Sequence, residues 1–303
     1  YTLWHTLSLH DALPISTEIV PVVSFIVTEP PYNADPSGAE DCTAAFSAAL
    51  ADADRDGGTV FAPAGRYRFD GELRIPTGVT LRGVRRQPTA TDGAVAGTVL
   101  MAYAGRGKAD GKSFITLEKG GISDVSIFYP QQTVDAIVPY PITVLMINDS
   151  MVRNVTLVNP YRGIQTSNFS TVINLYGTPL HTGIIMRHAA AVPRINHIRF
   201  SPRYWSESGL PNAPEQSALR RTLLEARATG VQLNRQDGGI FRDVQIEHYH
   251  TGAKFMPPHG WTYWHEIHMR DVEIGLNFVG GIFTTASLTS SSIDARRYAV
   301  LMR

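Results

Sequence analysis

A four-residue pattern returns at nearly constant spacing along the second half of the chain and constrains the fold more than any other feature. It consists of a glycine, an apolar residue, a variable residue and a second largely apolar residue. The copies begin at Gly163, Gly183, Gly230, Gly252 and Gly275. Successive starts are 20, 47, 22 and 23 residues apart, and a spacing of 22 leads back to Pro141 and on to Arg297. A period of this length indicates a repeat protein in which each coil stacks on the next.

A second pattern alternates with the first and places an Asn, Asp or His between apolar residues. Its copies begin at Ile122, Val152, Ile195, Phe241 and Met269. Each coil therefore holds several short strands, and we predict an all-β fold, a single-stranded right-handed parallel β-helix. A leucine-rich repeat has a similar length but needs a Leu-x-x-Leu-x-Leu consensus, which these units lack. Short polar side chains suit bends, so we interpret Asp124, Asn154, Asp243 and Asp271 as structural residues.

The 47-residue interval equals one coil plus an insertion, which we place at residues 201–229. Pro214 suits a first helical turn, Leu219, Leu223 and Ala226 share one helix face, and Gly230 closes the segment. We therefore expect one helical insertion that projects from the β-helix.

Residues 32–84 predict a cap and the first coils. Asp41 can cap a helix that runs to about Asp54, and Gly57-Gly58 ends it. The apolar stripe of this helix consists of Phe46, Ala49, Leu50 and Ala53. An open stack of parallel strands needs such a cover at its end.

The same segment carries Asp35-Pro36-Ser37-Gly38, then the helix, Gly57-Gly58, Pro63 and Gly65-Arg66-Tyr67. This order resembles the opening of the pectate-lyase-like superfamily, which includes polygalacturonase-related proteins and phage tailspikes. The resemblance implies a β-helix fold and a polysaccharide partner. It leaves the activity open, because hydrolases, lyases, epimerases and non-enzymatic adhesins share this opening. The Asn-Thr-Asp, Asp-Asp and Gly-His-Gly signatures of polygalacturonases are absent.

Composition excludes some partners and leaves the cell compartment open. Basic and acidic residues number 27 each, which argues against nucleic acid, and no apolar run is long enough to span a membrane. The single cysteine, Cys42, excludes an internal disulfide.

The N-terminal segment is treated separately from the domain. Residues 6–15 resemble a translated sequencing adapter, so we expect residues 1–16 to be an artefactual or disordered tail. We expect residues 17–303 to form one domain that is truncated at its C-terminus. We expect a secreted, periplasmic or cell-surface protein whose signal peptide is missing.

One strip of outward residues predicts where a glycan binds. The third position of the glycine pattern faces outward because its neighbours face the core. Gln165, Gln232 and Lys254 occupy it and can hydrogen-bond sugars along a groove; plain solvent exposure explains them equally well. The further substrate-binding residues that we predict are Asn168, Trp205 and His259.

The turns beyond these strands carry the predicted catalytic residues, Arg187, His188, Arg235 and Asp237. Two guanidinium groups on neighbouring coils can hold a uronate carboxylate, and a histidine can transfer a proton. Asp237 suits a general acid or a calcium ligand, although Gly238-Gly239 also makes it an ordinary turn residue. We predict cleavage of an extended, uronate-containing polysaccharide by hydrolysis or β-elimination. The alternative is a non-catalytic glycan-binding or tailspike-like β-helix. The sequence requires no cofactor, predicts no bound metal, permits Ca²⁺, and leaves the oligomeric state open.

Overall fold

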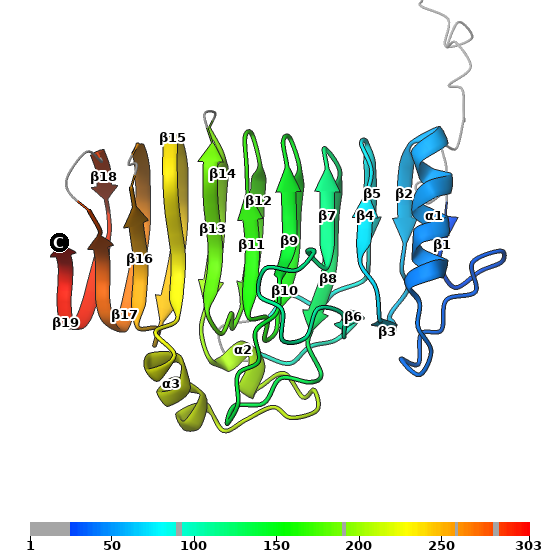
Figure 1. Ribbon diagram of the computed structural model, residues 1–303, viewed down its shortest axis with the longest axis horizontal. Helices are drawn as coiled ribbons and strands as arrows, with labels where there is room; N and C mark the ends of the chain where they lie inside the picture. Colours follow the sequence, from blue (N-terminus) through cyan, green and yellow to red (C-terminus); the bar gives the residue numbers. More distant parts are fainter. Residues whose placement is uncertain (1–24, 89–92, 190–191, 258–259, 281–284) are drawn as a thin grey trace, which may run out of the picture.

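The chain winds into a rod of stacked coils (Figure 1). The computed structural model describes residues 25–88, 93–189, 192–257, 260–280 and 285–303, and the predicted tail at residues 1–16 lies outside them. The pairings between its named strands are parallel and join strands of adjacent coils. The predicted right-handed parallel β-helix is confirmed.

Each coil has three sides, which we call sides I, II and III in chain order. Strands β2, β5 and β18 belong to side I, β3 and β6 to side II, and β4, β7, β9, β11, β13 and β16 to side III. The strands confined to one side are β1 (Phe25–Ile26), β2 (Gly58–Phe61), β3 (Gly65–Phe69), β4 (Leu73–Ile75), β5 (Val79–Arg82), β6 (Thr98–Ala102), β7 (Ile115–Glu118), β9 (Ile142–Ile147), β11 (Arg162–Thr166), β13 (Thr182–Ala189), β16 (Thr251–Met256) and β18 (Thr285–Thr289). The strands that bend across a corner are β8 (Gly121–Phe128), β10 (Met151–Leu157), β12 (Thr171–Gly177), β14 (Arg194–Phe200), β15 (Thr229–Glu247), β17 (Trp261–Phe278) and β19 (Ser292–Met302).

The core is built from identical positions of successive coils. On side III, Ile164 pairs with Ile184, Ile184 with Val231, and Val231 with Ala253, and all four side chains are fully buried. Each large apolar side chain buried in this way contributes about 1.5 to 3 kcal/mol. The repeated glycine pattern therefore marks the strand register correctly.

The repeated glycines are required by close packing between two sides of the rod. A Cβ atom at Gly183 would overlap the ring of Phe200, and one at Gly230 would lie 2.6 Å from Cδ1 of Ile246. A larger residue at these positions would push an apolar side chain of side II out of place.

The register corrects the two outermost copies of the glycine pattern. Ile142 pairs with Arg162 and Val144 with Ile164, so Thr143, not Pro141, stands opposite Gly163. Ile274 pairs with Tyr298 and Leu276 with Val300, so Ala299, not Arg297, stands opposite Gly275.

A polar ladder follows the bend between sides I and II. Nδ2 of Asn154 donates to Oδ1 of Asp124 at 2.8 Å, and Nδ2 of Asn174 donates to Oδ1 of Asn154 at 2.8 Å. Their backbones are left-handed, with φ of 59°, 54° and 57° for Asp124, Asn154 and Asn174, a conformation that Asn and Asp tolerate well. The structural interpretation of Asp124 and Asn154 is confirmed.

His197 and Asp243 continue this bend with φ of 58° and 54°, but Asp271 does not belong to it. Arg242 pairs with His265 and Val244 with Ile267, which puts Glu266 opposite Asp243. Asp271 stands one corner later, where it contacts His248, Arg220 and Arg296. The prediction that one motif contains both Asp243 and Asp271 was wrong because the sequence Met269–Ile274 resembles that motif by chance.

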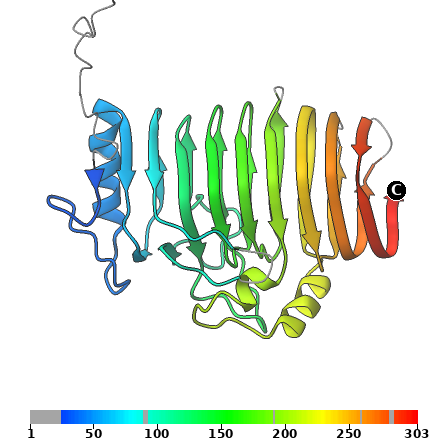
Figure 2. The same cartoon turned by 180° about the vertical axis from the view of Figure 1, so that it is seen from behind.

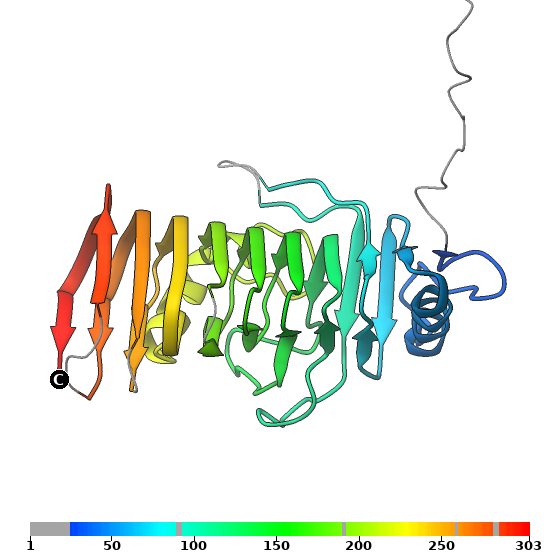
Figure 3. The same ribbon diagram turned by 90° about the horizontal axis from the view of Figure 1, so that it is seen from above.

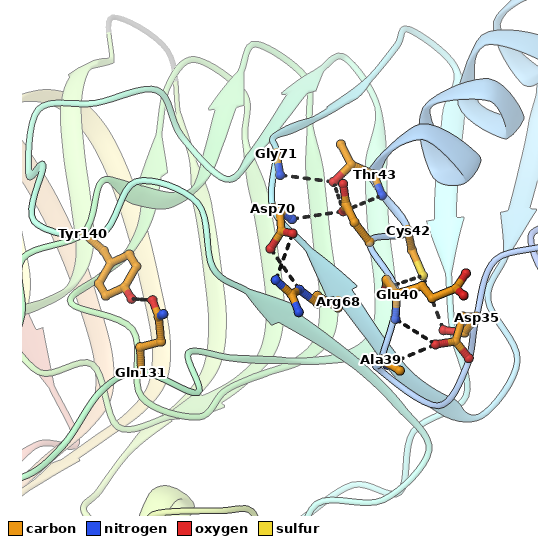
Figure 4. Close-up of polar contacts among 11 residues, drawn as sticks. Asp35, Ala39, Glu40, Cys42, Thr43, Arg68, Asp70, Gly71, Gln131 and Tyr140 are labelled. Atoms are coloured by element: carbon orange, nitrogen blue, oxygen red, sulfur yellow. Dashed lines mark hydrogen bonds and ion pairs between the residues drawn. The ribbon is translucent and has the colours of Figure 1, made fainter.

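Helix α1 (Thr43–Asp56) covers the N-terminal end of the rod, as predicted. Its buried Phe46 meets Tyr67 and Phe69 edge-on, with ring centroids 5.2 and 4.9 Å away. Figure 4 shows how side chains tie the helix start to the first coil: Thr43 Oγ1 accepts a hydrogen bond from the Gly71 amide at 3.1 Å.

The geometry of the opening motif comes from one carboxylate. Asp35 accepts hydrogen bonds from the backbone amides of Ser37, Ala39 and Glu40 at 2.9 to 3.0 Å (Figure 4). These bonds, with that of Glu40 the strongest, lower the pKa of Asp35 to about 2.

The predicted helical insertion follows β14 and contains α2 (Arg203–Ser206) and α3 (Gln216–Glu225). Both helices stand out from the rod on the side seen at the bottom of Figures 1 and 2. Leu219 and Leu223 are buried as expected, whereas Ala226 lies beyond the helix end and is exposed. Among the described helices, none has the length and apolar character needed to cross a membrane.

Candidate functional site

A groove of about 410 Å³ runs over side III, where the sequence predicts glycan binding. Three predicted residues line it: Gln165, Gln232 and Arg187. The other residues of its lining are Ala109, Asp110, Gly111, Ser113, Ile142, Leu145, Arg162, His181, Thr182, Ile185 and Asn234. We call this cavity the side III groove.

The floor of the groove is a file of outward side chains in register. Gln165 pairs with Ile185, Ile185 with Gln232, and Gln232 with Lys254. Neighbouring strands lie about 4.8 Å apart, so the polar groups follow one another along the rod axis. Gln165, Gln232 and Lys254 are all partly exposed, but Asn277, next in the file, is only 3 % exposed.

The segment between β6 and β7 forms one wall of the groove. Nη1 of Arg162 donates to the carbonyl oxygen of Ala109 at 3.2 Å and lies 3.5 Å from Oδ1 of Asp110. The Arg162 side chain is 26 % exposed and that of Asp110 is 96 % exposed. The guanidinium group is thus held in place from the groove wall, with Asp110 as a solvent-facing partner.

His181 lies in the groove beside Arg162 and was not among the predicted residues. Its Nδ1 is 2.8 Å from Oγ1 of Thr182, and its ring packs on Tyr161 with centroids 4.7 Å apart. Burial, followed by the nearby charges of Arg162 and Lys254, lowers the pKa of His181. When Thr182 accepts the proton of Nδ1, Nε2 carries the lone pair, and the neutral ring can act as a base.

A signal for His181 was present in the sequence. The tripeptide His-Thr-Gly occurs at 181–183 and again at 250–252. His250 makes the same contact, with Nδ1 2.9 Å from Oγ1 of Thr251, and burial lowers its pKa as well. Both tripeptides make the same local contact, so the motif alone does not identify a functional histidine. His181 differs from His250 because it lines the side III groove.

The lining of the groove is positively charged. Arg162 and Arg187 line it, Lys254 follows Gln232 in the floor, and Asp110 is the carboxylate among the described lining residues. Such a surface favours an anionic ligand. No group of three potential metal-ligating side chains gathers among the described residues.

Arg187 is exposed at the far end of the groove and has Asn234 as its register partner. Arg235 follows one position later, so the register does not place the two arginines directly opposite each other. The side chains of His188, Arg235 and Asp237 lie outside the described residues, and His259 lies outside them altogether. Their roles stay predictions.

Two other predicted binding residues lie away from the groove. Trp205 on α2 is completely buried, so it cannot stack on a sugar, and its predicted role is corrected to core packing. Its position on an insertion was a poor guide because the insertion packs its own aromatic residues inward. Asn168 lies half-buried in the turn after β11 and outside the groove lining.

A family model described as rhamnogalacturonase A/epimerase, pectate lyase-like, matches residues 30–254. The chain belongs to this family. The match includes α1, the insertion and the groove floor as far as Lys254. All lining residues of the side III groove therefore lie within the part of the chain that matches the pectate lyase-like family. No curated protein sequence matches this pectate lyase-like chain.

Solved structures share the fold at low sequence identity. The Dettilon tailspike protein matches with a TM-score of 0.61 and 12 % identity over 84 % of this chain and 46 % of the tailspike. The phiAB6 tailspike, solved with oligosaccharides of Acinetobacter baumannii surface polysaccharide, matches with a TM-score of 0.55 and 14 % identity. The match covers 89 % of this chain and 46 % of the tailspike. DFA-IIIase of Arthrobacter chlorophenolicus A6, solved with GF2, matches with a TM-score of 0.52 and 9 % identity. The match covers 92 % of this chain and 84 % of the enzyme. The pectate lyase-like chain thus spans less than half the length of either tailspike.

Proposed function

We propose that this chain binds an extended acidic polysaccharide along side III and cleaves it by β-elimination in the side III groove. The observation that carries the proposal is the position of His181, a half-buried histidine with a lowered pKa, between Arg162 and the polar floor of the groove. Membership of the pectate lyase-like family and the tailspike solved with a surface oligosaccharide support a polysaccharide substrate.

The chemistry needs a base and a cation. Nε2 of His181 takes the proton from the carbon next to the uronate carboxylate. The electron pair left on that carbon forms a double bond as the glycosidic carbon–oxygen bond breaks, and the leaving oxygen takes a proton from solvent. Arg162 and Arg187 neutralise the carboxylate and so stabilise the negative charge that develops beside it.

Hydrolysis is supported less well. It needs two carboxyl groups about 5 to 9.5 Å apart, and the described lining supplies Asp110. Asp237 remains the predicted second carboxylate, with Arg235 and His188 as predicted neighbours and Ca²⁺ as a predicted ligand of Asp237. A secreted or cell-surface location is part of the same proposal.

The test is product analysis on a panel of uronate and neutral polysaccharides. β-Elimination gives unsaturated, ultraviolet-absorbing ends on the uronate polymers; hydrolysis gives reducing ends without unsaturation, which would overturn the proposed reaction. His181→Asn should abolish product formation. Arg153→Ala, an exposed substitution on strand β10 outside the groove, is the matched control and should leave the rate unchanged.

The second candidate is a non-catalytic glycan-binding β-helix, favoured by the two tailspikes among the structural matches. In that case, the uronate polymers bind without any product. Binding would then weaken in Arg187→Ala but not in His181→Asn.

A further inference from the structure

A second cavity, of about 750 Å³, lies on side II, away from the side III groove. It is enclosed by the outward side chains of side II, by Gln87 and Pro88 of the segment after β5, and by Arg203 and Tyr204 of α2. Figure 3 shows that the segment after β5 runs along the rod and not around it. The volume of the cavity falls in the range of about 300 to 1,000 Å³ typical of small-molecule sites. We call it the side II cavity.

The floor of the side II cavity is a file of long polar side chains. Thr156 pairs with Tyr176, Tyr176 with Arg199, and Arg199 with Gln245 in successive coils. Tyr176, Arg199 and Gln245 line the cavity together with His197 at the neighbouring bend.

A hydrogen-bonded chain of four side chains crosses the floor. Oδ2 of Asp243 lies 2.6 Å from Nδ1 of His197, and Nε2 of His197 lies 2.9 Å from the Tyr176 hydroxyl. The amide Nε2 of Gln87 donates to the same hydroxyl. Because Asp243 is a carboxylate, Nδ1 of His197 donates to it, and in the neutral ring Nε2 accepts the Tyr176 proton.

The base of this chain is held as a carboxylate. Burial opposes ionisation of Asp243, but hydrogen bonds from Arg199 and His197 outweigh it and lower the pKa of Asp243. Nη2 of Arg199 lies 2.6 Å from Oδ1 of Asp243, and Nη1 donates to the Asp243 carbonyl oxygen at 2.7 Å. The floor is therefore rigid before any ligand binds, which lowers the entropic cost of binding.

The walls carry an excess of positive charge. Arg199, Arg203 and Arg270 line the cavity, and Glu247, which lies 3.6 Å from Arg270, is the carboxylate among the described lining residues. Asp243 and Glu207 pair with Arg199 and Arg203 but are not lining residues. The lining therefore favours a ligand that carries a negative charge.

Arg85 lies next to the floor of the cavity, over the Tyr176 ring at 4.9 Å, and is not itself a lining residue. Its Nε donates to Oγ1 of Thr156 at 2.9 Å, while its Nη2 is buried and has no hydrogen-bond partner among the described residues. Burial lowers the pKa of Arg85 to about 10, so the group stays charged at neutral pH. Arg85 therefore adds a positive charge next to Tyr176, which favours an anionic ligand in the cavity.

We propose that the side II cavity binds one carboxylate-bearing sugar unit, with Arg203 and Arg270 receiving the carboxylate and Gln87, Tyr176 and Gln245 receiving the hydroxyl groups. This site is separate from the groove on side III and does not depend on cleavage there. Amide and phenol groups match sugar hydroxyls, and guanidinium groups match a carboxylate through paired hydrogen bonds.

The test is the binding of monosaccharides to the full chain, measured by calorimetry or ligand-observed NMR. Glucuronate and galacturonate should bind at least about tenfold more tightly than glucose and galactose, because a charge-assisted hydrogen bond is worth about that factor. Acetate and inorganic phosphate should not displace them. Because a monosaccharide has no glycosidic bond to cleave, this result is independent of product formation on side III.

Two variants assign the site. Arg270→Gln removes a side chain that is 70 % exposed and should weaken glucuronate binding about tenfold. Tyr176→Phe keeps the ring contact with Tyr204 and should weaken it about threefold or more by removing one hydrogen bond. Arg153→Ala is the matched control. Equal binding of glucose, displacement by acetate or phosphate, unchanged affinity in both folded variants, or no binding of either uronate would each overturn the proposal.

Discussion

The side-chain amide of Asn174 donates a 2.8 Å hydrogen bond to Asn154, which donates an equal bond to Asp124. Three residues whose bonded neighbours lie 30 and 20 positions apart in the sequence thus form one continuous ladder along the rod. The same three residues hold left-handed backbone conformations. The ladder therefore stabilises both the bend of each coil and the stacking between coils.

Replacing the central member of the ladder should destabilise the protein. Asn154→Ala removes two hydrogen bonds, worth about 1 kcal/mol each, and leaves alanine in a left-handed conformation at a cost of about 1 kcal/mol. We expect the free energy of unfolding to fall by roughly 2 to 3 kcal/mol in denaturant titrations. Asn154→Gly should recover the backbone part alone, and Arg153→Ala should have little effect. Equal stability of Asn154→Ala and Arg153→Ala would contradict this account.

The glycine at the corner of side III should tolerate no side chain. In Gly183→Ala the new methyl group overlaps the Phe200 ring and comes within 2.6 Å of the Gly230 carbonyl oxygen. Overpacking of this kind costs about 1 to 3 kcal/mol or more, visible as a lower midpoint of thermal unfolding. The control is Gly239→Ala, where the nearest atom is the flexible end of Met186 at 3.3 Å. A Gly183→Ala variant as stable as Gly239→Ala would refute the packing argument.

The proposed base should give cleavage a specific pH dependence. The pKa of His181 lies below the ordinary value of about 6.5 because of burial and the charges of Arg162 and Lys254. The neutral ring persists above that lowered pKa, so kcat/KM should be full at neutral pH and fall only in mildly acidic solution. Lys254→Gln should move the acid limb to higher pH, whereas Arg55→Gln, on distant α1, should not. An acid limb that stays in place in Lys254→Gln would show that another group sets it.

Asp271 should link the insertion and the last strands to the rod. It accepts hydrogen bonds from Arg220 of α3 at 2.7 Å and from Arg296 of β19, and contacts His248. These bonds, with that of Arg296 the strongest, hold the pKa of Asp271 far below its usual range. The stabilisation of the folded state by the Asp271 carboxylate is fully present above the ordinary carboxyl pKa of about 3.9. It is lost as the pH falls toward the lowered pKa that Asp271 has in the folded protein.

Asp271→Asn should accordingly lower the free energy of unfolding at neutral pH by about 1 kcal/mol, a modest figure because the site is partly screened by solvent. The difference from the unaltered chain should shrink in acid. Glu225→Gln, on the same helix as Arg220, is the control. A constant difference at all pH values would exclude the carboxylate as its source.

The fold was predictable because its determinants are local and repeat. Each repeated glycine marks a position where a larger side chain would collide with side II, and the Asn and Asp residues mark a left-handed bend. The predicted positions were wrong where a residue other than Gly, Asn or Asp occupies the equivalent place in a coil. Thr143 replaces the glycine by making a hydrogen bond to the Arg162 carbonyl oxygen, and Glu266 occupies the left-handed bend position in place of Asp or Asn.

The candidate site was predictable only in part. The outward file containing Gln165 and Gln232 follows from strand alternation, and Arg187 follows from its place at a strand end. His181 precedes its glycine in a position that strand alternation does not mark as a site, and the wall segment that holds Arg162 comes from a different coil. In the chain Gln87–Tyr176–His197–Asp243, directly bonded residues lie as far as 89 positions apart, and no local pattern brings them together.

The three-sided register also limits how such a chain can change in length. A deletion of one residue inside a strand would turn core side chains outward in that coil, whereas the corners already accommodate long detours such as residues 201–229. Insertions and deletions should therefore be tolerated either as whole coils or as excursions at corners. Ligand specificity can then diversify through the excursions while the rod that carries them keeps its periodicity.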